Sequence, residues 1–336
     1  MEKEMKSTNK SKLNTALHFV KVNKNLFIRY GLLILVVVVF AAATGGRIFS
    51  KFSISSILSQ LTPLMILCVG MTFIFAHGNF DISSGAVLAL SALVSIFVIN
   101  GMGCTPISVF VALLVGIVLC EVFYLFNIFV SIKFRIMSTI GSLAIMFTAR
   151  GAVTYLVSKT MSGYKLNDTA ALALFREQWF MILCMIIIAV VGWFVFSFTS
   201  FGKYDRAIGD NPLSSMQSGA KVNQVKYISY AIAGVCVGIA TLFYLSRTNS
   251  VTQNFGQGRE MDIMIALILG GMLLSGGSKS RMSSAIVGSI TYVILTNGLS
   301  QLGLADAYVL IIKSVVFIIM IGTTLRRSST IKAMPR

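Results

Sequence analysis

Charged side chains are scarce in this chain. Of its 336 residues, 12% are charged and 56% are hydrophobic. Soluble domains contain about 25% charged residues, spread over their surfaces. Here long stretches carry no charge, and the charged residues crowd into short segments between them. Because hydrocarbon cannot solvate ions, this distribution is typical of a protein that crosses a membrane several times, and it argues against a soluble fold.

Acidic residues are especially few, with 11 Asp and Glu against 28 Lys and Arg, and the formal net charge is +17. Such an excess of positive charge often indicates nucleic-acid binding. The basic residues, however, lie in short segments between apolar stretches. In that position, Lys and Arg mark the cytoplasmic side of a membrane protein. We therefore expect a lipid bilayer as the surroundings and no nucleic-acid partner.

The sequence also lacks the motifs of catalysis and metal binding. Its five cysteines lie in or near apolar stretches without a CxxC spacing, and its two histidines are far apart. This argues against a disulfide framework or a metal site. The chain has no Walker A, HExxH, GxSxG or GxGxxG motif. We expect no enzyme activity and no bound cofactor, and an ATPase, if one is needed, must be another chain.

Apolar stretches long enough to cross a bilayer recur about ten times. A helix needs about 20 apolar residues to span the hydrocarbon core. The sequence therefore predicts an all-α, polytopic membrane fold. The predicted spans are residues 26–44, 56–76, 84–100, 107–130, 136–157, 179–198, 228–246, 261–275, 283–299 and 307–325. The eighth and ninth are short and glycine-rich, so one or both could be broken or partly re-entrant.

The basic residues orient these spans. If the N-terminus is cytoplasmic, 19 of the 28 Lys and Arg residues fall in cytoplasmic segments and seven in outside segments. The positive-inside rule then predicts that both termini are cytoplasmic. The expected organisation is a tail at 1–25, a transmembrane domain at 26–325 with a cytoplasmic loop at 199–227, and a tail at 326–336. The first apolar stretch is too long for the hydrophobic region of a signal peptide and should remain as a helix.

A polar segment, residues 78–85, joins the second and third predicted spans. It contains Asp81, the only acid between Glu4 and Glu121. One interpretation is that Asp81 caps the following helix by accepting backbone N–H bonds. The other is that the segment breaks a helix at depth and lines a substrate path. On the second interpretation the candidate path residues are Asn79, Phe80, Asp81 and Ser83.

Residues 256–262 follow the same order of glycines, acid and apolar helix, five spans later. An odd offset reverses orientation, so spans 2–5 and 7–10 could be inverted repeats, and transporters often bind solute at such an interface. Glu260 and Asp262 are therefore candidate path residues. Two independent helix caps would give the same pattern.

Two further features could serve packing or function. Residues 269–277 are rich in glycine, which allows helices to approach closely. Four polar side chains fall within apolar runs, where such groups usually face the bundle interior or a water path. They are Glu121, Arg150, Asn297 and Lys313. Arg150 could instead reach outward from its helix end. Asn297 is a candidate path residue.

The loop 199–227 is the longest predicted cytoplasmic connection. Asn211 followed by Pro212 predicts a short helix over 212–218, with Asn211 as its N-cap and Pro212 at its first position. A short helix at the membrane face suits docking of a cytoplasmic partner. The alternative is a solvated linker whose charge follows the positive-inside rule.

Taken in order, these motifs resemble the permease subunit of ribose-type, or more broadly monosaccharide-type, ABC importers. The resemblance covers residues from about Phe49 to Leu325. The family's glycine–Ile-Asp-Leu-Ser–Gly signature matches Gly78 to Gly85, with Asp81 and Ser83 in place. A second motif matches Gly256, Gly258, Glu260, Asp262 and Ile265-Ala266, and Gly270-Gly271, Gly276-Gly277 and Asn297-Gly298-Leu299 follow at the family's spacing. The family's cytoplasmic segment matches Phe201, Gly202, Lys203, Tyr204, Gly209, Asn211, Ser218 and Gly219.

The resemblance implies a fold of about ten helices, paired with a second permease subunit, identical or paralogous, around one pore. It implies a cytoplasmic ABC ATPase that uses the ATP, and an extracytoplasmic solute-binding protein. The loop 199–227 would supply the helix that docks on the ATPase. The chain departs from the family at Asp210, which replaces a glycine, at Leu213-Ser214-Ser215, and at Ser278-Lys279-Ser280-Arg281. These departures bear on how the ATPase docks.

The function expected is import of a monosaccharide, such as ribose, across the cytoplasmic membrane. A nucleoside or a furanose-like signalling sugar is the alternative substrate. An ion-coupled transporter or channel is a second class, which co-purification of an ATPase would distinguish. A membrane enzyme is a third class, which would need a cluster of nucleophile, base or metal ligands that the sequence does not show.

Overall fold

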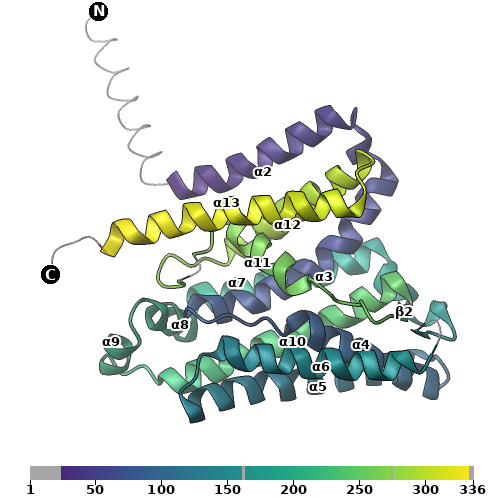
Figure 1. Ribbon diagram of the computed structural model, residues 1–336, viewed down its shortest axis with the longest axis horizontal. Coiled ribbons are helices and arrows are strands. Elements are labelled where there is room, and N and C mark those ends of the chain that lie inside the picture. The colour runs from purple at the N-terminus through teal and green to yellow at the C-terminus, as the bar shows by residue number, and fades with distance from the viewer. Residues whose placement is uncertain (1–23, 161–162, 274, 333–336) are drawn as a thin grey trace, which may run out of the picture.

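The computed structural model describes residues 24–160, 163–273 and 275–332, and most of them are helical (Figure 1). Most of the predicted tail at 1–25 and the last four residues of the tail at 326–336 lie outside these ranges. The helical elements are α2 (Lys24–Ala43), η1 (Arg47–Phe49), α3 (Lys51–Ala76), α4 (Ser84–Gly101), α5 (Pro106–Phe134), α6 (Ser138–Ser158), η2 (Thr169–Arg176), α7 (Gln178–Phe198), α8 (Ser200–Asp210), α9 (Pro212–Gln217), α10 (Val222–Thr248), α11 (Arg259–Leu269), α12 (Ser283–Gln301) and α13 (Asp306–Lys332).

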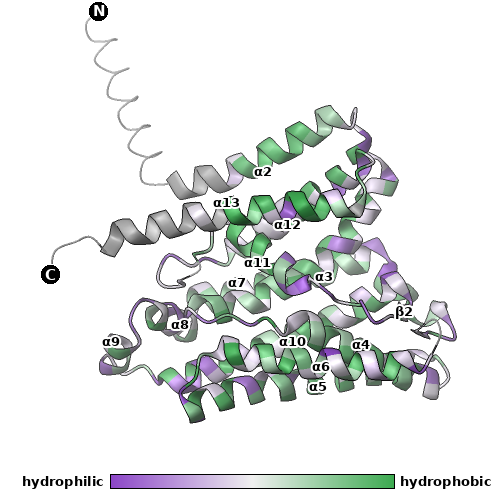
Figure 2. Ribbon diagram, in the orientation of Figure 1, coloured by the Kyte–Doolittle hydropathy of each residue, from purple (hydrophilic) through white to green (hydrophobic). Residues whose placement is uncertain are grey.

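Six of these helices are long and apolar enough to cross a membrane, namely α3, α4, α5, α6, α7 and α10. Shorter apolar stretches lie within α2 and α13. Figure 2 shows hydrophobic residues along the long helices and hydrophilic residues concentrated in their connections. The chain is thus an all-α, polytopic membrane protein. A helix stands at each position where a span was predicted, while the crossing of the membrane by all ten stays a prediction.

The eighth predicted span, 261–275, is shorter than expected. Its helix α11 ends at Leu269, and Gly271 after it has a φ of 82°. Eleven residues rise only about 17 Å, about half of the hydrocarbon thickness. The α11 helix alone is therefore too short to span the bilayer, which agrees with the prediction that this segment is broken or partly re-entrant.

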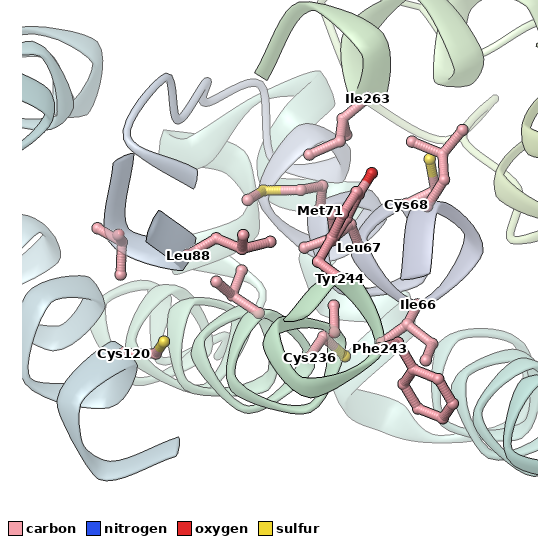
Figure 3. Close-up of a cluster of buried hydrophobic side chains, with 14 of the residues drawn as sticks. Ile66, Leu67, Cys68, Met71, Leu88, Cys120, Cys236, Phe243, Tyr244 and Ile263 are labelled. Carbon is pink, nitrogen blue, oxygen red and sulfur yellow. The ribbon is translucent and has the colours of Figure 1, made fainter. Parts of the chain in front are cut away.

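Helices α3 and α10 form the centre of the bundle and are buried along most of their length. Helix α10 packs against α3 and α5, with α4–α6 on one side of this pair and α2, α12 and α13 on the other (Figure 1). Figure 3 shows the core at the crossing of α3 and α10, where Ile66, Leu67 and Met71 lie near Phe243 and Tyr244. By contrast, α5, α6 and α7 are mostly exposed, as expected for helices that face lipid.

Glycines allow the central helices to approach closely. At Gly238 of α10, an added Cβ would lie 2.6 Å from the Ile117 Cα of α5. At Gly70 of α3, it would lie 2.6 Å from the Cys236 Cβ of α10. Helices in membranes gain most of their association energy from such close van der Waals packing. These small residues therefore set the spacing of the core.

A short ribbon, which the sequence did not predict, joins two connections. Strand β1 (Tyr164–Lys165) pairs antiparallel with β2 (Ser250–Val251). Asn249 and Gly163 have positive φ values of 53° and 78°. The ribbon ties the α6–α7 connection to the end of α10. It lies at the end of the bundle opposite α8 and α9, the start of α2 and the end of α13 (Figure 1).

We expect Gly238→Ala to lower the free energy of unfolding by about 1–3 kcal/mol, because the new methyl group overpacks a contact with backbone. The matched control is Gly151→Ala on α6, where an added Cβ meets nothing within 4 Å. Alanine there should stabilise the helix by about 0.4–1 kcal/mol. Unfolding titrations in mixed detergent micelles would measure both variants, and equal effects would contradict the packing argument.

Candidate functional site

Asp262 organises an ionic cluster that joins three helices. Its Oδ2 accepts a hydrogen bond from Arg259 Nη1 at 2.8 Å, and its Oδ1 accepts one from Lys313 Nζ at 3.3 Å. The Tyr292 hydroxyl donates to the same Oδ1. Asp262 is buried, with 7% of its surface exposed. Because a buried carboxylate needs several donors, this cluster fixes the start of α11 against α12 and α13.

A cavity of about 150 Å³ lies beside this cluster, between α3, α10, α11, α12 and α13. Most of its lining is polar, and it includes Gln60, Arg247, Arg259, Tyr292, Thr296 and Lys313. Arg259 and Lys313 also lie over aromatic rings, 5.0 Å from the Tyr244 centroid and 5.2 Å from the Tyr292 centroid. These contacts hold the two cations at the cavity wall.

Asn297 lies behind this cavity rather than in its wall. Its Oδ1 accepts hydrogen bonds from Gln60 Nε2 at 2.9 Å and from Ser56 Oγ at 3.3 Å. Its Nδ2 donates to the carbonyl of Val293 at 3.0 Å. Asn297 therefore positions Gln60, which does line the cavity.

Asp81 forms a second buried polar cluster. Its Oδ1 accepts from the Ser83 backbone N at 2.8 Å and from Ser83 Oγ at 2.6 Å, and its Oδ2 accepts from Asn127 Nδ2 at 2.8 Å. The residue that precedes α4 is Ser83, so Asp81 does not cap that helix directly. The capping interpretation is wrong in this respect: the carboxylate instead holds the turn before α4 and ties it to α5.

Asn79 and Phe80 lie in the same turn. The Asn79 backbone N donates to the carbonyl of Ile74, and the Phe80 ring packs edge-on against Phe75 at 4.8 Å between centroids. Neither residue is among those that line the cavity. The turn and the cavity are thus separate parts of the described structure.

The two sequence segments that look alike lie against each other. A Cβ added to Gly85 would clash with the Glu260 carboxylate and with the Gly256 carbonyl. Conversely, a Cβ on Gly256 would clash with the Gly85 carbonyl. Arg150 Nη1 donates to the Phe255 carbonyl at 2.6 Å, so this side chain holds the second segment instead of reaching out to lipid headgroups. Glu260 lies at this seam, outside the cavity.

At the opposite end, α8 and α9 make up most of the predicted cytoplasmic loop. The Asn211 side chain accepts from the backbone N of Leu213 and Ser214, and Pro212 is the first residue of α9. The predicted cap and short helix are confirmed. Phe201 stacks on Phe73, and Gly202 packs against the backbone of Phe196, so α8 is held to the bundle.

The outer surface of this loop is exposed and partly apolar. Its large exposed side chains are Tyr204, Leu213 and Met216, and Lys203 is exposed beside them. Tyr and Met are enriched and Lys is depleted in protein–protein interfaces, so the apolar side chains are the part of this surface that suits docking.

A buried pair ties α8 to the end of α3. His77 Nδ1 lies 2.9 Å from Asp205 Oδ1, and both side chains are fully buried. The Ser229 hydroxyl on α10 lies 3.0 Å from the same oxygen. Burial raises the pKa of the Asp205 carboxyl, while the His77 imidazole opposes that rise. Asp210 adds a second tie, because its Oδ2 accepts from the Ser278 backbone N at 3.0 Å.

The structure brings only some of the predicted path residues together. Of the predicted path residues, Asp262 belongs to the cluster at the cavity and Asn297 supports it, whereas Asn79, Phe80, Asp81, Ser83 and Glu260 lie elsewhere. Arg247, Tyr292 and Gln60 were not singled out from the sequence. In the part of the chain that the structure describes, no group of three or more His, Cys, Asp and Glu side chains could hold a metal ion.

The family model described as "Branched-chain amino acid transport system / permease component" matches residues 53–321. A ribose import permease protein of Bacillus subtilis is 29% identical over 320 residues, which are 93% of this chain and 96% of that protein. One from Escherichia coli K12 is 28% identical, over 86% of this chain and 90% of that protein. An autoinducer 2 import system permease protein of Photorhabdus luminescens is 26% identical over 76% of each chain.

We expect His77→Ala to lower the free energy of unfolding by about 1–3 kcal/mol, because it leaves the buried Asp205 carboxyl with the Ser229 hydroxyl but without the imidazole. Lys203→Ala on the exposed face of α8 is the control and should change that energy by less than about 0.5 kcal/mol. Titration with a denaturing detergent would measure the free energy of unfolding of both variants. A cost for His77→Ala no larger than that of the control would contradict the buried pair.

Proposed function

From the premise that this chain belongs to the family of branched-chain amino acid transport system permease components, we propose that it is the membrane-spanning permease subunit of an ATP-driven importer of a monosaccharide. Ribose or a related simple sugar is the proposed solute. The observation that carries this proposal is the similarity to a ribose import permease over 93% of the chain. The polar cavity supports it, because its hydrogen-bonding side chains and tyrosine rings suit a small hydroxylated solute.

The proposed topology has ten crossings, with both termini in the cytoplasm and α11 plus the glycine-rich turn after it as a broken crossing. The start of α2, the end of α13 and the loop α8–α9 lie at one end of the bundle, which supports this arrangement (Figure 1). Spans 2–5 then correspond to α3–α6 and spans 7–10 to α10–α13. The contact between Gly85 and Gly256 supports an inverted repeat, since equivalent segments of such repeats meet at their interface.

The proposed partners are a cytoplasmic ABC ATPase, a second permease subunit and an extracytoplasmic solute-binding protein. The ATPase docks on α8 and α9 and consumes the ATP, and this chain itself binds no cofactor. The ties from α8 to His77, and from Asp210 to the turn at Ser278, then carry movement of the docked ATPase to α3 and to the glycine-rich turn. Such rigid links suit alternating access, in which helices rock around a fixed site.

A furanose-like signalling sugar is the second candidate solute. The similarity to an autoinducer 2 import permease supports it, at 26% identity over 76% of the chain. The ribose permeases match a larger part of the chain at higher identity, so ribose is the first sugar to test.

Replacing Leu213 and Met216 of α9 with serine should at least halve the amount of ATPase that co-purifies with the chain in mild detergent. Both side chains are exposed in the described structure and would be buried by docking, and apolar anchors of this kind dominate interface energies. The matched control is Leu302→Ser, an exposed leucine near the opposite end. The control should retain the native amount of ATPase.

The outcome of this pull-down separates two failures. If the ATPase stays bound to the variant with serine at Leu213 and Met216, the result would contradict docking on α9. The absence of any ATPase from native protein that still transports sugar would contradict an ATP-driven importer and favour ion coupling.

A further inference from the structure

We propose that the cavity between α3 and α10–α13 binds an anionic oxygen group, a phosphate or carboxylate, carried by the solute. This inference deepens the proposed function and rests on it. It narrows the proposed solute from monosaccharides in general to an acidic or phosphorylated monosaccharide. The cavity volume of about 150 Å³ suits a small group rather than a large ligand.

The first argument is the charge of the cavity. Arg247, Arg259 and Lys313 all line it, and the described lining includes no acidic residue. Asp262 pairs with Arg259 and Lys313 at once, so one carboxylate serves two cations. Within the described part of the chain, Arg247 has no carboxylate within 4.0 Å. Arg247 is an exposed residue in the last turn of α10, so this cation is accessible, and the excess positive charge at the cavity would attract an anion.

The second argument is which hydrogen-bond donors remain for a ligand. The Thr296 hydroxyl donates to the Val293 carbonyl, and the Ser300 hydroxyl donates to the Thr296 carbonyl. Gln60 donates to Asn297, and the Tyr292 hydroxyl donates to Asp262. Four of the neutral donors around the cavity are therefore already engaged, and the Tyr244 hydroxyl and the three cations remain. Arginine has five N–H donors and lysine three, so most of the donors that remain are cationic and favour an anionic acceptor.

The third argument is placement. Stacking over the Tyr244 ring orients the Arg259 guanidinium, whose planar shape matches the paired oxygens of a carboxylate or phosphate. The cavity is built from the C-terminal parts of α10 and α12 and the N-terminal parts of α11 and α13. In the proposed topology these lie toward the extracytoplasmic side, where a solute delivered from outside arrives first.

The test uses the full chain in nanodiscs of phosphatidylcholine, with ionic strength held constant by chloride. The probes are inorganic phosphate, ribose and ribose 5-phosphate, and the readout is the shift of the unfolding midpoint with probe concentration. We expect ribose 5-phosphate to bind at least about tenfold more tightly than ribose, as a charge-assisted hydrogen bond would give. Inorganic phosphate should also raise the midpoint.

Arg247→Gln should remove this preference, because Arg247 is the cation that has no carboxylate partner among the described residues. Arg247→Lys keeps the positive charge and should retain most of the preference for ribose 5-phosphate over ribose. Lys159→Gln is the matched control: Lys159 also lies over a tyrosine ring, 4.4 Å from the Tyr155 centroid, but it is not among the residues that line the cavity. The control should bind the three probes as the native chain does.

Three results would overturn the proposal. The first is equal binding of ribose and ribose 5-phosphate, and the second is a preference that survives Arg247→Gln. In the third, phosphatidylglycerol in the nanodisc raises the midpoint of the native chain but not of Arg247→Gln, while the soluble phosphates have no effect. The anion would then be a lipid headgroup.

The proposed function can fail separately. Phosphate binding that depends on Arg247, in a chain that supports no sugar uptake with an ATPase, would keep the anion site and contradict the importer. ATP-driven sugar uptake, in a chain whose unfolding midpoint does not respond to phosphate, would keep the importer and contradict the anion site.

Discussion

The inability of hydrocarbon to solvate polar groups is the constraint on which the rest of this structure depends. A charge that is buried among the helices is costly unless it finds a partner inside the bundle. Asp262 therefore pairs with Arg259, Lys313 and Tyr292. Asp81 accepts hydrogen bonds from Ser83 and Asn127. Asp205 pairs with His77 and Ser229. These three carboxylates join helices that are distant in the sequence.

The three clusters lie at different places in the bundle, and each holds a different part of it. The Asp262 cluster borders the polar cavity, and the Asp205 cluster holds the loop that we propose as the ATPase docking site. The Asp81 cluster lies in the turn that follows His77, next to the seam where Gly85 meets Gly256. Helix α3 passes the cavity at Gln60 and ends beside Asp205, so one rigid element connects both ends.

The sequence predicted the helices better than the site, for a physical reason. Apolar stretches locate helices because they must match the bilayer, and Asn211 with Pro212 located α9 because capping is local. The break in the eighth span was anticipated from its glycines, but the exact end of α11 at Leu269 and the pairing of β1 with β2 were missed, since they depend on glycine geometry and on contacts between distant segments. In helices that are apolar on nearly all sides, the sequence does not indicate which side faces the interior of the bundle. The pairings of His77 with Asp205 and of Lys313 with Asp262 could therefore not be predicted from the sequence, and neither could the cavity.

The central claim, that this chain is the permease of an ATP-driven sugar importer, is tested most directly by uptake in proteoliposomes. The vesicles would contain the chain with its co-purified ATPase, with a solute-binding protein and labelled ribose outside. The account predicts uptake that requires ATP in the compartment of the ATPase and is unchanged when proton and sodium gradients are collapsed. Uptake driven by an ion gradient without ATP would contradict it.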